Sequence, residues 1–391
     1  MKKILVSILA LLPLCATAQY NPEILRTPVA QPAQRVELIL PVVNGYNIYK
    51  ADLHTHSIYS DGEVTPAFRV REAYFDGLDA IAITEHIEYR RIEGKMLKFV
   101  KGYTDGKALK AQNYDLIRKP ADEKGILADL NYPVDEAIKE SKKYDVLVIK
   151  GAEITREPVA IGHFNALFTK DNNALYDPDP LQSLKNARAQ GALIQHNHPG
   201  WRRTSCDKTE FEKKAYAEGL IDGIEVANGG SLYLPIIARA KEDNLFVAAN
   251  TDIHPTTAEY YRLKGQMRNM TLIFAKERTL ESLREALEAK RTLALSGGYV
   301  SGDEQLLKDL FLASIEYKVV ATDKKGTRTV RIMNNCSLPY QFKTSKNANP
   351  VTLQPFQSLQ LSVAKDKKLN LTVTSMLCGD MLHPKVTLDV E

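Results

Sequence analysis

The chain has 391 residues and a formal net charge of +4, and its hydrophobic and charged residues make up 44% and 26% of the sequence. These fractions are typical of a globular protein and exclude a chain that has no folded core, and the length suits one large domain followed by a small one. The small net charge gives no indication of a nucleic-acid partner and does not exclude one.

The N-terminus has the pattern of a secretory signal peptide. Met1 to Lys3 is basic, and the apolar run from Ile4 to Leu14 is too short to span a bilayer. Ala16-Thr17-Ala18 offers small residues for cleavage, so the mature chain is expected to begin at Gln19. We therefore predict a signal peptide at residues 1–18 and an exported protein, periplasmic or secreted, with no further membrane span.

The four cysteines leave two questions open. Cys15 raises the alternative of a lipid anchor, but Leu14 precedes it where a small residue is expected, so lipidation ranks below simple cleavage. Export permits disulfides, and Cys336 could pair with Cys378, which would leave Cys206 over. Three unpaired thiols are the alternative.

Residues 19–45 hold several prolines and little periodicity, which predicts a linker or an arm on the domain surface. From residue 46 to 304, short apolar runs alternate with amphipathic helices, a rhythm that predicts a parallel α/β fold. The segment 89–131 is polar and poorly periodic and is expected to be an insertion. The expected strands are 48–53, 79–84, 145–150, 163–168, 192–195, 223–226, 245–249, 270–274 and 293–296, and the helices 67–76, 133–143, 179–190, 232–242 and 280–290.

The pattern changes after about residue 305. Apolar or alternating segments at 313–320, 327–333, 358–363, 370–374 and 385–390 predict strands, which are separated by Asn, Gly, Lys and Pro clusters. Residues 305–391 are therefore expected to form a small all-β, sandwich-like domain. It holds one histidine, His383, and no clustered chemistry, so we expect a structural or adhesive role.

A His-x-His motif follows the first predicted strand. His54 and His56 are two residues apart, so on an extended chain both imidazoles point to the same face. Asp61 follows a Ser-Asp-Gly turn that could return a carboxylate to the same place. Two nitrogens and one oxygen that converge in this way begin a metal site, whereas two exposed polar residues on one strand face are the alternative.

The other histidines strengthen the metal interpretation. Seven of the eight lie at or beside a predicted strand end of the α/β unit, where the loops of such folds build the active site. The carboxylates Asp61, Glu153 and Asp252 follow predicted strands in the same way, and Asp252-x-His254 repeats the spacing of the first motif. Together these features predict a metal site. The seven histidines are 54, 56, 86, 163, 196, 198 and 254.

The motifs also resemble a known family. In chain order they read DLHTHS, SDG, ITEH, GAEIT, a strand that begins with histidine, NHPG, IEVANG and NTDIH. This series, over roughly residues 50–300, is similar to the PHP superfamily, which includes the polymerase-associated exonuclease-like domain and histidinol phosphatase. The resemblance implies a distorted seven-stranded β/α barrel with two or three metals at its mouth.

The resemblance also implies a ligand set. One metal would be bound by His54, His56 and Asp252, a second by His163 and His198 with Glu153 as a bridge, and a third by Asp61, His86 and His254. Two features depart from the usual pattern. Glu85 stands where the family often has Asp, and His196 is an additional histidine, which we expect to support a ligand more than to be one.

Mixed histidine and carboxylate ligands suit Zn, Mn or Fe, in the divalent state, more than an all-oxygen Mg²⁺ site. Such metals activate water and can hold the oxygens of an in-line phosphoryl displacement. We predict Asp61, Glu153, Arg156 and Arg202 as catalytic residues, with one of Arg156, Arg202 and Arg203 clamping a substrate phosphate. Solvated surface arginines are the alternative. Trp201 is expected to line the pocket.

The leading hypothesis is an exported metal-dependent phosphoesterase that acts as a monoesterase on a small phosphorylated substrate. A phosphodiesterase or nuclease on nucleotides or nucleic acid is the next alternative, although the charge does not indicate nucleic acid. A non-catalytic metal-bearing binding protein is a second class. An amidohydrolase-like enzyme ranks third because it usually needs a bridging Lys, and Lys150 alone lies near a motif. The sequence does not indicate an oligomeric state.

Overall fold

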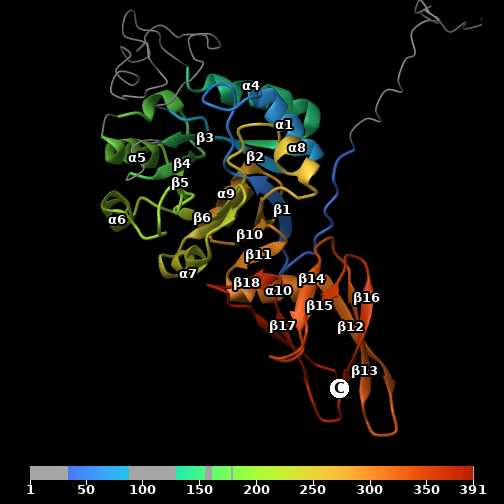
Figure 1. The fold of residues 1–391 in the computed structure, drawn as a ribbon. Coiled ribbons are helices and arrows are strands. Elements are labelled where there is room, and N and C mark those ends of the chain that lie inside the picture. The colour runs from blue at the N-terminus through green and yellow to red at the C-terminus, as the bar shows by residue number, and fades with distance from the viewer. Residues whose placement is uncertain (1–33, 88–128, 155–160, 178, 391) are drawn as a thin grey trace, which may run out of the picture. The chain divides into compact units, whose positions relative to one another are not determined.

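The computed structural model describes residues 34–87, 129–154, 161–177 and 179–390 (Figure 1). The predicted signal peptide, Cys15, Arg156 and nearly all of the predicted insertion lie outside the described residues. Within the described part of the chain, no helix is both long and apolar enough to cross a membrane.

One curled sheet of twelve strands positions the candidate site. Its order is β18-β11-β10-β9-β1-β2-β3-β4-β5-β6-β7, and β8 pairs with β6. The strands are β1 (Asn47–Asp52), β2 (Ala80–Ile83), β3 (Leu147–Ile154), β4 (His163–Leu167), β5 (Leu193–Asn197), β6 (Gly223–Asn228), β7 (Ser231–Leu232), β8 (Phe246–Asn250), β9 (Met270–Ala275), β10 (Thr292–Ser296), β11 (Tyr299–Gly302) and β18 (Met376–Leu377).

The sheet curls until β8 faces β9 and β10. Side chains make this junction in place of a backbone ladder, since the hydroxyl oxygens of Thr271 and Thr292 accept hydrogen bonds from the backbone N–H groups of Ala249 and Val247, each at 3.0 Å. These hydroxyls satisfy backbone donors that burial would otherwise leave at a cost. The mixed α/β, barrel-like fold expected from the sequence is confirmed.

The strand directions correct one expectation. The pairs β1–β2, β2–β3, β5–β6 and β6–β8 are parallel, as predicted, but β4 is antiparallel to β3 and β5, and β9 is antiparallel to β1 and β10. The eight residues between Ile154 and His163 are too few for a parallel crossover, which needs about a dozen. The expectation of a parallel α/β fold therefore holds for these four strand pairs, and the sheet as a whole is mixed.

The helices begin where the sequence predicts starts. Thr65 caps α1, and Pro66 occupies its first turn, while Asp179 caps α5 in the same manner. Three of the described helices, α6, α8 and α10, were not expected from the sequence. The helices are α1 (Pro66–Phe75), α4 (Tyr132–Tyr144), α5 (Pro180–Ala189), α6 (Glu210–Ala217), α7 (Leu234–Glu242), α8 (Thr257–Tyr260), α9 (Leu280–Glu288) and α10 (Glu304–Ser314).

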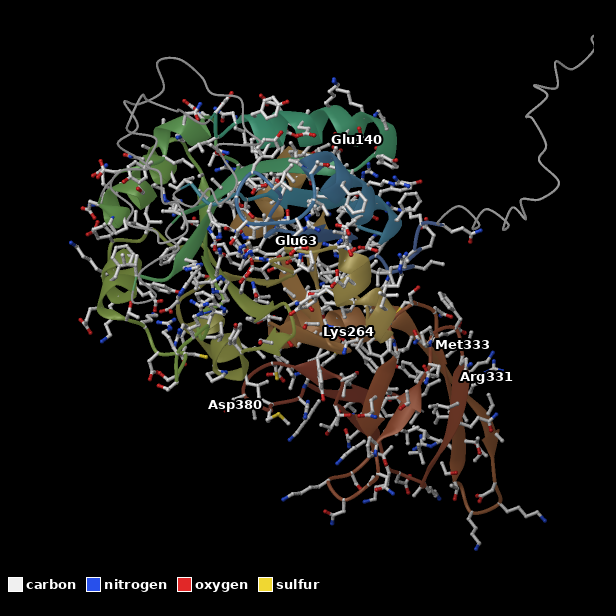
Figure 2. All side chains as sticks on the ribbon, turned by 45° about the horizontal axis from the view of Figure 1, so that its top comes forward. Glu63, Glu140, Lys264, Arg331, Met333 and Asp380 are labelled. Atoms are coloured by element: carbon white, nitrogen blue, oxygen red, sulfur yellow. The ribbon has the colours of Figure 1, made fainter. Side chains whose placement is uncertain are left out.

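Two small antiparallel sheets follow α10, which confirms the expected all-β region. One contains β12 (Ile315–Thr322), β13 (Arg328–Asn334) and β16 (Ser358–Val363), and the other contains β14 (Tyr340–Lys343), β15 (Val351–Leu353), β17 (Leu369–Val373) and β19 (Lys385–Leu388). Along β13, Val330 and Ile332 are buried, whereas Arg331 is exposed and Met333 is half-buried. Figure 2 labels Arg331 and Met333 on this strand. This alternation is that of a strand with one face on a core.

These sheets share a hydrophobic core with the curled sheet. Phe311 of α10 and Phe342 of β14 belong to the same buried cluster as Leu272 of β9. Strand β18, from the C-terminal region, pairs with β11 of the curled sheet. The backbone of Ile39 also forms hydrogen bonds of 2.9 and 2.8 Å with Ser337.

The three cysteines of the described residues are free thiols. Cys336 is buried, and its sulfur lies 3.6 Å from the Tyr340 hydroxyl. The alternative of a Cys336–Cys378 disulfide is therefore wrong, and the alternative of three unpaired thiols describes the structure.

Candidate metal centre

The His-x-His pair lies just beyond β1, which ends at Asp52. Both imidazoles are buried, and the Nε2 atoms of His54 and His56 are 3.1 Å apart. The i, i+2 spacing therefore directs both rings to one point, as the sequence predicts. Asp52 helps to fix the backbone of this segment, since its side chain accepts a hydrogen bond from the His54 N–H at 3.2 Å.

All nine residues predicted as ligands converge in the structure. Within each of four groups, the candidate ligand atoms lie within 4.8 Å of one another. His54, His56, Glu153 and His198 each belong to two of these groups, so the groups overlap and form one cluster. The groups are His56, Asp61, His86 and His254; His54, His56 and Glu153; His54, His198 and Asp252; and Glu153, His163 and His198.

Glu153 is at the centre of this cluster. It lies within β3, near its end, and not beyond the strand as predicted, because β3 continues to Ile154. The position suits the bridging role that the family resemblance implies, since ligand nitrogens surround the carboxylate. The nearest distances are 3.4 Å to His54 Nε2, 3.4 Å to His56 Nε2, 2.8 Å to His86 Nδ1, 3.2 Å to His163 Nδ1 and 3.7 Å to His198 Nε2.

Asp252 adds a second carboxylate from the loop after β8. Its Oδ1 lies 3.3 Å from His54 Nε2 and 3.0 Å from His56 Nε2, and its Oδ2 lies 3.7 Å from His198 Nε2. Both Asp252 and His198 have positive φ, 51° and 25°. Residues other than glycine adopt this conformation at an energetic cost, and such strain concentrates at functional sites.

The third carboxylate, Asp61, lies among imidazoles at the other side of the cluster. Its Oδ1 is 3.1 Å from His254 Nε2 and 3.5 Å from His86 Nε2. The turn that carries it is tight, because a Cβ at Gly62 would come within 2.7 Å of the His56 backbone. Glycine is therefore required beside Asp61.

The electrostatics of the cluster fit a cation site. Burial disfavours charge on His54 and His86, but nearby carboxylates, Asp252 and Glu153 for His54 and Glu153 and Asp61 for His86, raise both pKa values, that of His86 to about 10. Burial also opposes ionisation of Glu153, but the imidazoles of His86 and His54 hold its pKa well below the usual range. The cluster therefore favours bound positive charge. A divalent metal would replace the ring protons, so the donor set fits such an ion.

Glu225 of β6 orients two of the candidate ligands, and the sequence analysis did not identify it. The buried carboxylate accepts hydrogen bonds from His54 Nδ1 at 2.9 Å and from the His198 backbone N–H at 2.7 Å. It also accepts from the Asn228 and Asn250 side chains at 2.8 and 2.9 Å. With Nδ1 donating to Glu225, His54 presents Nε2 to the cluster.

Glu85, the departure from the family pattern, does not face the cluster. Its carboxylate accepts hydrogen bonds from the Ser57 backbone N–H at 3.2 Å and from the Ser57 and Ser60 hydroxyls. The Ser60 oxygen lies 3.3 Å from His56 Nδ1. Glu85 therefore acts on His56 through Ser60, in the way that Glu225 acts on His54 directly.

Arg69 of α1 joins two loops that carry candidate ligands. It is almost fully buried, and it donates to the carbonyl oxygen of His56 at 2.7 Å and to those of Ile253 and His254 at 3.1 and 2.5 Å. Glu72 balances its charge at 2.7 Å. Because the charge is paired and hydrogen-bonded, its burial is tolerated.

His196 points away from the four ligand groups. Its Nε2 lies 3.1 Å from Glu212 Oε1 and its Nδ1 lies 3.0 Å from the Tyr216 hydroxyl. The ring also stacks on Phe164, with the ring centroids 5.0 Å apart. This placement agrees with the expectation that His196 supports a ligand more than it binds a metal.

A pocket of about 370 Å³ opens over the cluster. Trp201 lines it, as predicted, with its ring centroid 5.3 Å from that of His163 and 5.5 Å from that of His198. Tyr233 and Tyr260 line it as well. No Lys or Arg is present among the described residues of the lining.

The predicted arginine clamp is placed only in part. Arg202 is exposed, with its guanidinium 4.4 Å above the Trp201 ring, and its role stays a prediction. Arg203 pairs with Glu212 at 3.0 Å and donates to the carbonyl oxygen of Pro199, and it is not among the residues that line the pocket. Arg156 lies outside the described residues.

Comparison with solved structures finds a relative that covers most of the chain. A two-domain protein from Bacteroides vulgatus that contains a predicted PHP-like metal-dependent phosphoesterase matches with 32% identity and a TM-score of 0.80, over 92% of this chain and 99% of that chain. An amidohydrolase from Chromobacterium violaceum matches with 13% identity and a TM-score of 0.34, over 54% of this chain and 89% of that chain. The lesion-specific endonuclease Q of Pyrococcus furiosus matches with 16% identity and a TM-score of 0.38, over 66% of this chain and 59% of that chain.

The last two likenesses are too remote to indicate an activity. No curated protein matches the chain. The model of the PHP domain matches residues 52–280, which is more than half of the chain and includes every candidate ligand. The family resemblance drawn from the motifs is confirmed, and the chain belongs to the PHP domain family.

Proposed function

We propose that this chain hydrolyses a phosphate monoester of a small molecule, with two or three divalent metals of the Zn, Mn or Fe type in its centre. The observation that carries the proposal is the convergence of nine histidine and carboxylate ligands in four overlapping groups below one pocket. The family relationship, to a protein described as a metal-dependent phosphoesterase, points to the same class of reaction.

The three sets of ligands implied by the resemblance would hold the metals. When bound, such metals supply hydroxide at neutral pH and stabilise charge on the transferred phosphoryl group. The protein fixes the geometry: Glu225 and Glu85 orient His54 and His56, and the buried position of Glu153 keeps its carboxylate among five imidazoles. We propose Asp61 and Glu153 as the catalytic carboxylates through this ligand role.

The charge balance supports a phosphate substrate without an arginine in the described lining. Asp61, Glu153 and Asp252 are the three carboxylates among the nine candidate ligands, so the charge of two or three divalent ions exceeds the negative charge of the ligands themselves. A positive centre inside a partly closed pocket attracts a phosphate dianion. We keep Arg156 and Arg202 as proposed contacts of the substrate, beyond the metals.

A monoester is favoured over a nucleic acid by the pocket. Proteins that hold nucleic-acid strands line the path of the backbone with cations, and the described lining of this pocket contains none. Its volume of about 370 Å³ is within the range of small-molecule sites. An amidohydrolase-like reaction, which usually needs a bridging lysine, is less supported, because the described residues that line the pocket include no lysine.

The test uses the mature chain from Gln19, purified and analysed for metal content per chain. It is then assayed on matched mono- and diesters of the same chromogenic alcohol, with and without a chelator. Two or three transition metals and chelator-sensitive turnover of the monoester are expected. Faster turnover of the diester would move the assignment to a phosphodiesterase. Bound metal without turnover of either ester would contradict the proposal.

We also propose that the protein is exported and cleaved before Gln19. The support is the basic, apolar and small-residue pattern of residues 1–18. Mass spectrometry of the N-terminus, on protein recovered from the host's periplasm or medium, is expected to find Gln19 first. An N-terminus at Met1 in the cytoplasmic fraction would contradict export, and a lipid-modified Cys15 would favour the anchored alternative.

A further inference from the structure

Glu212 lies close to the side of the cluster that contains His163 and His198, the two histidines grouped with Glu153, and it belongs to none of the four ligand groups. We propose that Glu212 is a positioning residue, which sets the geometry of the His163–His198 side of the metal centre. The inference rests on the proposed metal centre and names a further residue on which its metal affinity depends.

The contacts of Glu212 reach the chain on both sides of His198. Its Oε1 is 3.1 Å from Nε2 of His196, two residues before His198, and 3.0 Å from Arg203 Nη1. Arg203 in turn donates to the carbonyl oxygen of Pro199, the residue directly after His198. The carboxylate therefore holds the two ends of the short segment that carries His198.

The same carboxylate packs beside His163. A Cβ at Gly162, the residue before His163, would come within 2.7 Å of Glu212 Oε1, so the backbone of Gly162 lies against it. The φ of Gly162 is +83°, which also favours glycine. The buried side chain of Glu212 thus lies against residues close in sequence to both His163 and His198.

Glu212 is itself firmly held. It is fully buried, and its Oε2 accepts a hydrogen bond from the Thr209 N–H at 2.9 Å, which completes the capping box of α6. Burial opposes its ionisation, but the bonds from His196 and Arg203 lower its pKa to about 2. At neutral pH it is a fixed anion that α6 supports.

The segment after β5 needs such support. His198 has a φ of 25° and Arg202 has a φ of 52°, both costly for residues with side chains. Backbone strain of this kind persists only when surrounding contacts over-determine it. The bonds that Glu212 accepts from His196 and Arg203 restrain this segment. Their loss is expected to let His198 and Trp201 move.

The chain contains a reporter for this test. Trp201 is the only tryptophan, and its ring lies beside those of His163 and His198. Metal that binds between these histidines is expected to change its fluorescence. Glu212→Gln preserves the shape and removes the charge, and Glu210→Gln is the matched control, because Glu210 is exposed on the same helix and pairs with Lys213 at 2.7 Å.

The experiment titrates metal-free protein with Mn²⁺ and follows Trp201 fluorescence, with far-UV circular dichroism and the unfolding temperature measured in parallel. Glu212→Gln is expected to weaken the fluorescence-detected Mn²⁺ affinity by about 10–100-fold. Glu210→Gln is expected to match the wild type. A second expected result is that the wild type loses no metal on dialysis under conditions in which Glu212→Gln loses one equivalent.

Affinity within twofold of the wild type in a folded Glu212→Gln protein would overturn the inference. If that variant does not fold, Arg203→Met decides, because it cuts the link to Pro199 and leaves the Glu212–His196 bond, and an unchanged affinity there would likewise overturn it. A wild type that binds no metal would instead refute the proposed function, so the two failures are distinguishable.

Discussion

The edge of the curled sheet and the C-terminal sheets bury different kinds of side chain. At the sheet edge, imidazoles and carboxylates are buried together over Glu153. From Ile315 onward, Asn334 is the one buried residue with a polar side chain other than a thiol or phenol in the part of the chain that the structure describes. Because buried polar groups are costly unless they are paired, the contrast locates the chemistry in the first region and packing in the second.

The sharpest test of this contrast substitutes one polar residue in each region and compares the two variants. Glu153→Gln removes the charge that five imidazoles surround, so metal is expected to be lost and phosphoesterase activity to fall by more than the roughly 100-fold typical of a supporting residue. Elemental analysis and steady-state kinetics measure the two effects.

His383→Gln is the control in the C-terminal region, where His383 contacts the Met376 carbonyl oxygen at 2.7 Å. It is expected to change neither metal content nor kcat/KM. Lost metal in His383→Gln, or retained metal in Glu153→Gln, would break the contrast between the two regions.

The second prediction concerns whether the two regions unfold together. Phe311 is fully buried, and its ring centroid lies 5.0 Å from that of Tyr340. Phe311→Ala is expected to lower the free energy of unfolding by about 3–5 kcal/mol, since it opens a cavity in the shared core. Because α10 belongs to the same core as β9, calorimetry is expected to show one transition at a lower temperature.

Two separated transitions in that variant, one lowered and one at the wild-type unfolding temperature, would mean that the C-terminal sheets are an independent domain. The predicted boundary at residues 304 and 305 would then mark a real division. Leu312→Ala, at an exposed position of the same helix, is the matched control and is expected to have little effect.

The third prediction tests whether buried charge away from the ligands serves the centre. Arg69→Met removes the donors to His56, Ile253 and His254 and leaves Glu72 buried without its partner. Stability is expected to fall by about 3 kcal/mol, the usual cost of breaking a buried pair. Metal on the Asp61–His254 side is expected to be lost first.

Arg71→Met is the matched control for Arg69→Met, because Arg71 is exposed on the same helix and its guanidinium lies 5.9 Å from the Phe75 ring. Thermal unfolding and metal analysis of the two variants are compared. Equal effects would show that Arg69 acts on α1 alone and not on the ligand loops.

What the sequence could predict about the site depends on local spacing. His54 and His56 are identified because two residues on an extended chain share a face, and strand ends in such folds meet at one edge. Glu225 lies in the motif IEVANG, but its role is not identified, because its partner His54 is 171 residues away and nothing local marks the pairing. The roles of Arg69 and Glu212 are not identified either, since an isolated charged residue on a helix is usually at the surface.

The fold was predictable to a similar depth. Strand and helix positions follow from periodicity and capping, as at Thr65 and Pro66. The direction of β4 could not be predicted in this way. The helix α5 that follows it suggests a crossover to a parallel strand, but β4 and β5 are antiparallel. Helix α10 was missed although it carries the signal, since its buried residues Leu307, Leu310 and Phe311 have helical spacing.

The last predicted effect, which is absent at neutral pH, is an acid sensitivity that originates at Glu212. Its folded pKa of about 2 is below the usual value of a glutamate, so its bonds contribute stability above about pH 4.5, and that contribution is lost as the pH falls toward 2. The pKa of His196 is lowered by burial, so the neutral ring adds stability that declines as the pH falls below about 6.5. Both groups make the fold less stable in acid.

Glu212→Gln isolates the first contribution, because glutamine does not titrate while His196, Arg203 and Thr209 remain. With metal-free protein, the difference in unfolding free energy between wild type and variant is expected to be constant above pH 5. It should shrink by up to about 3 kcal/mol as the pH approaches 2. Urea unfolding at a series of pH values measures it. A difference that stays constant down to pH 2 would mean that the Glu212 carboxylate is not held as an anion, and the positioning role argued for it would lose its electrostatic basis.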